Sequence, residues 1–286
     1  MDLAPQFGLS PQVIEKDYVL GWMLAGLSAH AALAPSWVFK GGTCLKKCYF
    51  ETYQFSEDLD FTLLDAAHLN QDFLIATFEQ IADWIYQQAG IEIPRDTIRF
   101  DFYDNPRGKV SVLGRVGYRG PMQRRGDAPR IRFDLTNDEI LALEPSIREV
   151  NHPYSDKPEL GIQVRCYSFE EVFAEKVRAL AERTRPRDLY DVIHLYRHHD
   201  FRPDRAVVIQ TLQKNVNSKE LPYPLWQRLT CNQREQKLKQ TGNRCWRINC
   251  PHCRLSINSG KNCLIFSTGC MVSLKNLCDL LCNWPL

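Results

Sequence analysis

Apolar side chains recur along the first two hundred residues with two different periods, one helical and one strand-like. Ser10-Pro11 begins a helical stretch that continues to about residue 32, and residues 72–88 carry an apolar stripe at three- and four-residue spacing. Proline has no N–H, and the first turn of a helix leaves that group unbonded, so Ser10-Pro11 favours a helix start. Similar spacing predicts helices over residues 43–49, 168–185 and 187–196.

The segments between these helices are strand-like. Short apolar or alternating runs predict strands over residues 37–40, 55–64, 98–102 and 130–135. The glycines and arginines from Gly114 to Arg125 are typical of a basic loop, which we expect to join two antiparallel strands. Together the elements predict an α+β fold, in which a mixed sheet is flanked by helices and followed by a helical region.

Composition narrows the class of protein. The chain has 286 residues, of which 44% are hydrophobic and 24% charged, and this excludes disordered and fibrous proteins. Its 36 Lys and Arg residues against 34 Asp and Glu leave a net charge of +2, which favours neither a nucleic-acid coat nor a membrane-surface protein. The sequence lacks a long apolar span and a basic start followed by an apolar run, so we expect a cytoplasmic protein without a membrane partner.

Two short segments carry candidate chemistry. In the first, Gly41-Gly42-Thr43 follows a predicted strand and opens a helix, where glycines let the backbone approach a phosphate closely. In the second, Asp58 and Asp60 are two residues apart on a predicted strand, so they share a face. Adjacent carboxylates repel each other unless a cation lies between them, and Mg²⁺ bound through carboxylates and nucleotide phosphates meets that need. An ordinary turn and a solvated strand face are the alternatives.

Taken together, Gly41-Gly42-Thr43 and Ser56-Glu57-Asp58-Leu59-Asp60-Phe61 resemble the signature of the DNA-polymerase-beta-like nucleotidyltransferase superfamily. Within it, the chain is similar to the AbiEii-type toxins of abortive-infection and toxin–antitoxin systems over about residues 10 to 200. The narrower resemblance is carried by Glu15-Lys16-Asp17-Tyr18, Glu171-Val172-Phe173-Ala174-Glu175-Lys176, Arg178-Ala179-Leu180 and Arg187-Asp188-Leu189-Tyr190-Asp191.

The resemblance implies an activity and a set of partners. The reaction is transfer of a nucleoside monophosphate from a nucleoside triphosphate (NTP) to an acceptor, expected to be RNA, with tRNA one candidate. A separately encoded antitoxin would neutralise the toxin. Asp58 and Asp60 would bind Mg²⁺ or Mn²⁺, and the nucleotide would contact Gly41, Gly42, Thr43, Ser56 and Lys176.

Further catalytic residues are expected from elsewhere in the chain. Polymerase-like sites use a third carboxylate from a neighbouring strand, and Asp134 alternates correctly to supply it, with Asp138 and Glu139 as weaker substitutes. Lys176 and Asp191 align with the functional lysine and aspartate of the family, and a lysine near the triphosphate would offset charge as pyrophosphate leaves. A solvated salt-bridge face is the alternative.

The end of the chain differs in composition. Cysteines crowd it, and Cys250-Pro251-His252-Cys253 has the spacing of a zinc knuckle, although the second Cys-x-x-Cys of a zinc ribbon is absent, which disfavours Zn²⁺. We expect a nucleotidyltransferase core over residues 1–165, a helical region over 166–225 that completes the cleft, and a Cys-rich tail over 226–286 that departs from the family pattern. Two other functions stay open: a non-catalytic, zinc-containing nucleic-acid-binding protein, and a degenerate toxin.

Overall fold

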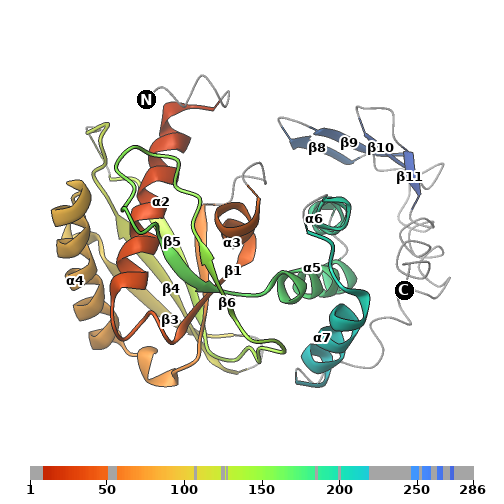
Figure 1. Ribbon diagram of the computed structural model, residues 1–286, viewed down its shortest axis with the longest axis horizontal. Coiled ribbons are helices and arrows are strands. Elements are labelled where there is room, and N and C mark those ends of the chain that lie inside the picture. The colour runs from red at the N-terminus through yellow and green to blue at the C-terminus, as the bar shows by residue number, and fades with distance from the viewer. Residues whose placement is uncertain are drawn as a thin grey trace. The chain divides into compact units, whose positions relative to one another are not determined.

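The computed structural model describes residues 9–50, 57–105, 108–123, 126, 128–183, 186–198 and 201–218, and the backbone of four strands between residues 246 and 273. It divides the chain into two units, Met1–Ser168 and Phe169–Leu286, which are described separately below (Figure 1).

The first unit is built on a seven-stranded sheet with the order β3-β4-β5-β2-β1-β7-β6. β1 runs parallel to β7 and β2 runs parallel to β5, whereas the other neighbours are antiparallel. The predicted mixed sheet is therefore confirmed. In chain order the strands are β1 (Trp37–Lys40), β2 (Asp58–Leu63), β3 (Arg99–Asp104), β4 (Val110–Gly117), β5 (Arg130–Thr136), β6 (Ser146–Glu149) and β7 (Gln163–Cys166).

Two long helices pack on one face of this sheet. α2 (Pro11–Ala29) and α4 (Gln71–Ala89) lie side by side along it (Figure 1) and contribute most of their buried residues to the core. The ring of Phe78 on α4 lies 5.0 Å from the rings of both Phe100 and Phe133, so this face of the sheet is the buried one. Leu59 and Phe61 belong to the same core. Because strand side chains alternate, Asp58 and Asp60 belong to the opposite face.

Short elements connect the strands. α3 (Gly41–Cys44) follows β1 without a loop and continues as the π-helical turn η1 (Leu45–Tyr49), in place of one regular helix over residues 43–49. Two 3₁₀ turns, η2 (Ala66–His68) and η3 (Arg95–Thr97), lie before α4 and β3. Ser10 occupies the N-cap position of α2 and Pro11 its first turn, as expected.

The predicted basic loop starts later than expected: only its part after Gly117 connects two antiparallel strands, β4 and β5, and its first part is itself a strand. Gly114, Arg115 and Gly117 belong to β4, which pairs with β3 on one side and β5 on the other. A neighbouring side chain packs closely against each of these glycines: a Cβ at Gly114 would lie 2.8 Å from Phe100, and a Cβ at Gly117 would lie 2.8 Å from Thr97. A glycine in a strand can mark such a close approach as well as a turn.

The second unit begins with three helices, α5 (Phe169–Arg183), α6 (Pro186–Arg197) and α7 (Arg205–Ser218), and both α6 and α7 pack against α5. Later in the chain, β8 (Trp246–Cys250), β9 (Cys253–Asn258), β10 (Cys263–Phe266) and β11 (Met271–Ser273) pair as an antiparallel sheet. Cys250 and Cys253 lie opposite each other in the β8–β9 register. Pro251, His252 and the side chains of the tail lie outside the described residues, and so does the predicted zinc site. Among the described helices, none has the length and apolar composition to cross a membrane.

Candidate active site

Three carboxylates lie on the same face of the sheet, opposite the face covered by α2 and α4. Asp60 on β2 pairs directly with Asp134 on β5, and Asp58 lies two residues before Asp60 on the same strand. Residues that pair across adjacent strands project to the same face, as do residues two apart on one strand. The structure therefore brings Asp58, Asp60 and Asp134 together, and their catalytic roles remain predictions.

The glycine turn lies directly against this face. Gly41 has a φ of +79°, a left-handed conformation that disfavours other residues, and a Cβ there would lie 2.0 Å from Oδ2 of Asp60. Thr43 contributes a second contact, since its hydroxyl donates a 2.6 Å hydrogen bond to the backbone carbonyl of Asp58. Gly41, Gly42 and Thr43 are consecutive in α3, so the predicted phosphate turn and the two aspartates form one local structure. Ser56 lies outside the described residues.

Asp134 is in an electrostatically unusual position. Burial raises the pKa of its carboxyl above the ordinary value, the charges of Glu139, Asp58 and Asp138 raise it further, and Lys40 opposes them. Among the described residues, its Oδ1 atom is buried without a hydrogen-bond partner. A buried carboxylate oxygen without a partner is costly, and a bound cation or a proton at this oxygen would lower that cost.

A lysine that the sequence analysis did not single out completes this face. Lys40 on β1 lies opposite Asp60 in the strand register. Its ammonium donates to the carboxylate of Glu139 and, at 3.3 Å, to Thr136 Oγ1. Tyr167 also donates to Glu139, over 3.0 Å. Glu139 is therefore held in an ion pair with Lys40, which makes it a poorer substitute for Asp134. Lys40 ends a short apolar strand, and neighbouring sequence alone carries no sign of its partner.

The residues present fit a divalent metal ion. Mg²⁺ is commonly bound by one or two carboxylates together with substrate phosphates. Here two carboxylates lie two positions apart on one strand, a third lies in register beside them, and the glycine turn follows the neighbouring strand. Two structural observations support this fit: Oδ1 of Asp134 has no partner among the described residues, and the glycine turn approaches the Asp60 carboxylate closely at Gly41.

The motif of the first helix has a structural role in this arrangement. Asp17 is buried and forms ion pairs with Lys46 and Lys47, the latter at 2.8 Å, so α2 is fixed to η1 just after the glycine turn. Burial raises the pKa of Asp17, but the two lysines overcome this effect and the net pKa is lowered. Lys16 in turn pairs with Glu57, at 2.5 Å, immediately before Asp58. These ion pairs hold α2 to the chain just after the glycine turn and just before Asp58.

The predicted distal residues meet in the second unit. Lys176 on α5 and Asp191 on α6 form an ion pair of 2.7 Å, with side chains that are 21% and 4% exposed. Asp188 is also buried. The side chain of Arg187 lies outside the described residues. α5 and α6 thus bring together the two residues that the family resemblance selected.

Comparison with known proteins decides the family. A family model described as nucleotidyl transferase AbiEii toxin, type IV toxin–antitoxin system, matches residues 22–244. The chain belongs to the AbiEii family. The family predicted from the residues is thereby confirmed, and the match passes residue 225, where we expected the family pattern to end. Membership supports the general role of a nucleotidyltransferase toxin, with an antitoxin as partner and a nucleotide as substrate.

Among solved structures, this AbiEii protein is similar to the crystal structure of JHP933 from Helicobacter pylori. The two share 16% sequence identity with a TM-score of 0.49, over 77% of this chain and 88% of that one. A search of curated proteins found no match.

The same face of the sheet in the AbiEii protein also carries a row of arginines. In the strand register, Arg99 on β3 lies opposite Arg115 on β4, and Arg115 lies opposite Arg132 on β5. Arg132 in turn lies opposite Asp58 on β2. All four side chains are exposed and alternate with buried neighbours, so they project to the same side of the sheet. The sequence pattern around residues 130–135 already contained Arg132, but only the strand register shows that this row ends at Asp58.

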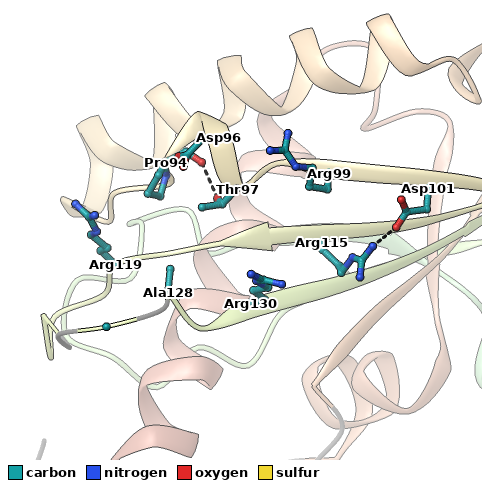
Figure 2. A pocket seen from close by; sticks show the side chains of 10 residues that line it. Pro94, Asp96, Thr97, Arg99, Asp101, Arg115, Arg119, Ala128 and Arg130 are labelled. Carbon is teal, nitrogen blue, oxygen red and sulfur yellow. Dashed lines mark hydrogen bonds and ion pairs between the residues drawn. The ribbon is translucent and has the colours of Figure 1, made fainter.

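Beside this row lies a basic hollow of about 530 Å³. Figure 2 shows its walls, to which four arginines contribute (Arg99, Arg115, Arg119 and Arg130). Arg115 is paired with Asp101, and Arg119 contacts Glu92 at 3.3 Å. In the described part of the chain Arg99 and Arg130 have no ion-pair partner, so the hollow keeps positive charge available for an anion.

Proposed function

We propose that this AbiEii protein transfers a nucleoside monophosphate from an NTP to an RNA acceptor in a reaction that depends on a divalent metal ion. The observation that carries the proposal is the alignment of Asp58, Asp60 and Asp134 on one face of the sheet, with Gly41 against Asp60. In this role the protein is the toxin of a pair, which a separately encoded antitoxin neutralises, and tRNA is the first acceptor to test.

Asp58 and Asp60 are the residues that would hold the ion, Mg²⁺ or Mn²⁺. When bound, such an ion offsets the negative charge of the triphosphate and makes its α-phosphorus more electrophilic. The backbone of Gly41-Gly42-Thr43, which opens α3 directly beside Asp60, would contact the phosphates.

Asp134 would take the proton of the attacking hydroxyl. In the reaction, the acceptor oxygen forms a bond to the α-phosphorus, the bond from that phosphorus to the bridging oxygen breaks, and pyrophosphate leaves. Asp134 is suited to the proton because burial raises its pKa and its Oδ1 has no partner among the described residues. A carboxylate of raised pKa is the stronger base, which favours transfer from a hydroxyl.

Lys176 would stabilise the charge that develops on the leaving pyrophosphate. Its ammonium donates to Asp191 at 2.7 Å, and this pairing restricts the position of the lysine side chain. A Lys176→Met variant should lose turnover, whereas Lys214→Met, an exposed lysine on α7 of the same unit, should not. Equal turnover in the two variants would remove Lys176 from the mechanism.

The arginine row supports a nucleic-acid acceptor. Arg99, Arg115 and Arg132 lie on three adjacent strands, and Asp58 lies on the next one. With about 4.8 Å between strands, Arg99 and Asp58 are about 14 Å apart across the sheet. Arginine binds phosphate oxygens through paired N–H groups, so such a row fits a phosphodiester backbone whose terminal hydroxyl approaches the carboxylates.

The direct test is transfer of label. Incubation with each α-labelled NTP, Mg²⁺ and total RNA, followed by electrophoresis, should label an RNA, and purified tRNA should be labelled if it is the acceptor. A double variant, Asp58→Ala with Asp60→Ala, is the matched control and should abolish the label. Label that persists in the double variant, or no label on any RNA with the wild type, would contradict the proposal.

A second experiment tests the acceptor surface. Arg99→Ala and Arg130→Ala should each raise KM for RNA and reduce the salt dependence of RNA binding by about one ion, while KM for the NTP stays unchanged. Lys157→Ala, which removes a cation paired with Glu149 away from this row, is the control and should leave KM for RNA unchanged. Salt-sensitive RNA binding without transfer would instead favour the non-catalytic function, and stabilisation by NTP without product would favour a degenerate toxin.

A further inference from the structure

Three cysteines that are far apart in the sequence meet in the core of the first unit. Cys44 ends α3, Cys48 lies in η1 and Cys166 ends β7, and their sulfur atoms all lie within 4.8 Å of one another. They are 0%, 7% and 0% exposed, and none of them is in a disulfide. Within the described residues, this is the only group of three metal-ligand atoms packed so closely.

The backbone explains why these thiols converge. Cys44 and Cys48 are four residues apart on the continuous α3–η1 helix, so they share a face. β7 runs parallel to β1, with Cys166 paired to Phe39 and the N–H of Tyr167 bonded to the Phe39 carbonyl at 3.0 Å. Because β1 leads directly into α3, this pairing places the end of β7 beside the helix face that carries the other two thiols.

The spacing suits a metal ion bound by thiolates. Zinc–sulfur bonds are about 2.3 Å long, so the sulfurs around a three- or four-coordinate ion are about 4 Å apart. The thiols would therefore need to move by less than about 1 Å to coordinate one ion. Soft thiolate ligands select zinc and other thiophilic metals over Mg²⁺, so this site would not compete with the carboxylates for the same ion.

Charge is also balanced at this position. Three thiolates and a divalent ion carry a net charge of −1, which is costly in an apolar core. Arg148 supplies the compensating charge, since its Nε donates to the Cys48 carbonyl at 2.9 Å and its guanidinium lies 4.4 Å above the ring of Tyr49. The Tyr49 hydroxyl lies 3.9 Å from Cys166 Sγ and donates a 2.6 Å hydrogen bond to the Tyr167 carbonyl.

We propose that Cys44, Cys48 and Cys166 form a binding site for one thiophilic divalent metal ion, Zn²⁺ being the physiological candidate. Binding releases the three thiol protons to solvent and forms three sulfur–metal bonds. These bonds would link the helix after the glycine turn to β7. Cys44 directly follows Thr43, which holds the start of β2. The bound ion therefore stabilises the fold around the candidate active site, and this inference does not depend on the proposed transfer reaction.

The test uses the full chain, reduced and freed of metal, and Cd²⁺ as the probe, because cadmium–thiolate bonds absorb in the near ultraviolet. Bound metal per chain, the charge-transfer absorbance and Tm are measured without nucleotide. A triple variant with alanine at the three positions should lose one equivalent of Cd²⁺ and the rise in Tm. The tail control, Cys250→Ala with Cys253→Ala, should keep both.

A second measurement avoids any effect of substitution on folding. Crystals of the wild-type chain with Cd²⁺ should show an anomalous-scattering peak equidistant from the sulfurs of Cys44, Cys48 and Cys166. A peak only among tail cysteines, no peak at all, or full Cd²⁺ binding by a folded triple variant would overturn the proposal. Transfer activity is not read in either experiment, so failure of the proposed function leaves this result unaffected.

Discussion

Replacing Gly41 by alanine tests the geometry of the candidate site most directly. The added methyl group would lie 2.0 Å from Oδ2 of Asp60, 2.9 Å from its Cγ and 3.2 Å from its Cβ. Ordinary contact needs about 3.4 Å, so the carboxylate must move by more than about 1 Å. A displacement of that size in a catalytic group costs on the order of 100-fold in rate. The φ of +79° adds about 1–2 kcal/mol of backbone strain.

Gly90 offers a matched control within the same unit. It ends α4 with a φ of +67°, and a Cβ there would meet nothing within 4 Å. Gly90→Ala should therefore lower the free energy of unfolding by about 1–2 kcal/mol through backbone strain alone. Its turnover should stay at the wild-type level, because no candidate site residue is displaced.

The assay combines urea unfolding with NMP incorporation for both alanine variants. Gly41→Ala should lose stability at least as Gly90→Ala does, and should also lose about 100-fold in kcat/KM. In an Asp60→Ala background the clash largely disappears, so the stability cost of Gly41→Ala should fall to that of Gly90→Ala. Wild-type turnover in Gly41→Ala, or an unchanged stability cost in the Asp60→Ala background, would refute the reasoning.

Three further predictions concern stability, measured by urea unfolding. Asp17→Ala should cost about 3–5 kcal/mol because it leaves the buried Lys47 ammonium unpaired, whereas Asp83→Ala at an exposed ion pair should cost under about 1 kcal/mol; equal losses would contradict this. Phe78→Ala should cost about 3–5 kcal/mol by opening a cavity among three aromatic rings, and a loss below about 1 kcal/mol would show that α4 does not pack there. Burial lowers the pKa of His152 to about 4 from 6.5, so the unfolded chain binds more protons and stability should fall by up to about 3 kcal/mol as pH drops from 6.5 to 4. His152→Gln should abolish that pH dependence, and its persistence would assign it to other groups.

Local pattern was sufficient for much of the fold. The long helices α2 and α4 follow from apolar residues at helical spacing, and β2 and β5 from alternation. Pattern failed at β4, because Gly114 and Gly117 have the composition of a loop. The missing side chains at these two positions allow Phe100 and Thr97 to pack directly against β4. Such a contact between separate segments leaves no periodic pattern in the sequence of either segment.

The same distinction applies to the candidate site. Asp58, Asp60 and the glycine turn could be selected because their chemistry lies within a few residues of one another. Lys40, the arginine row from Arg99 to Arg132 and the three thiols could not, since each depends on strand register or on residues more than about a hundred positions apart.

By itself, the amino-acid order determined the helices α2, α4, α5 and α6, four strands of the seven-stranded sheet, the family and the acidic pair. These depend on neighbours along the chain and on the spacing of a helix turn or a strand pleat. Only the tertiary structure decided which strands are adjacent, which residue faces Asp60 and where the cysteines meet. The reason is physical: pairing between distant segments is chosen by the burial of the whole core, and no short window of sequence contains that choice.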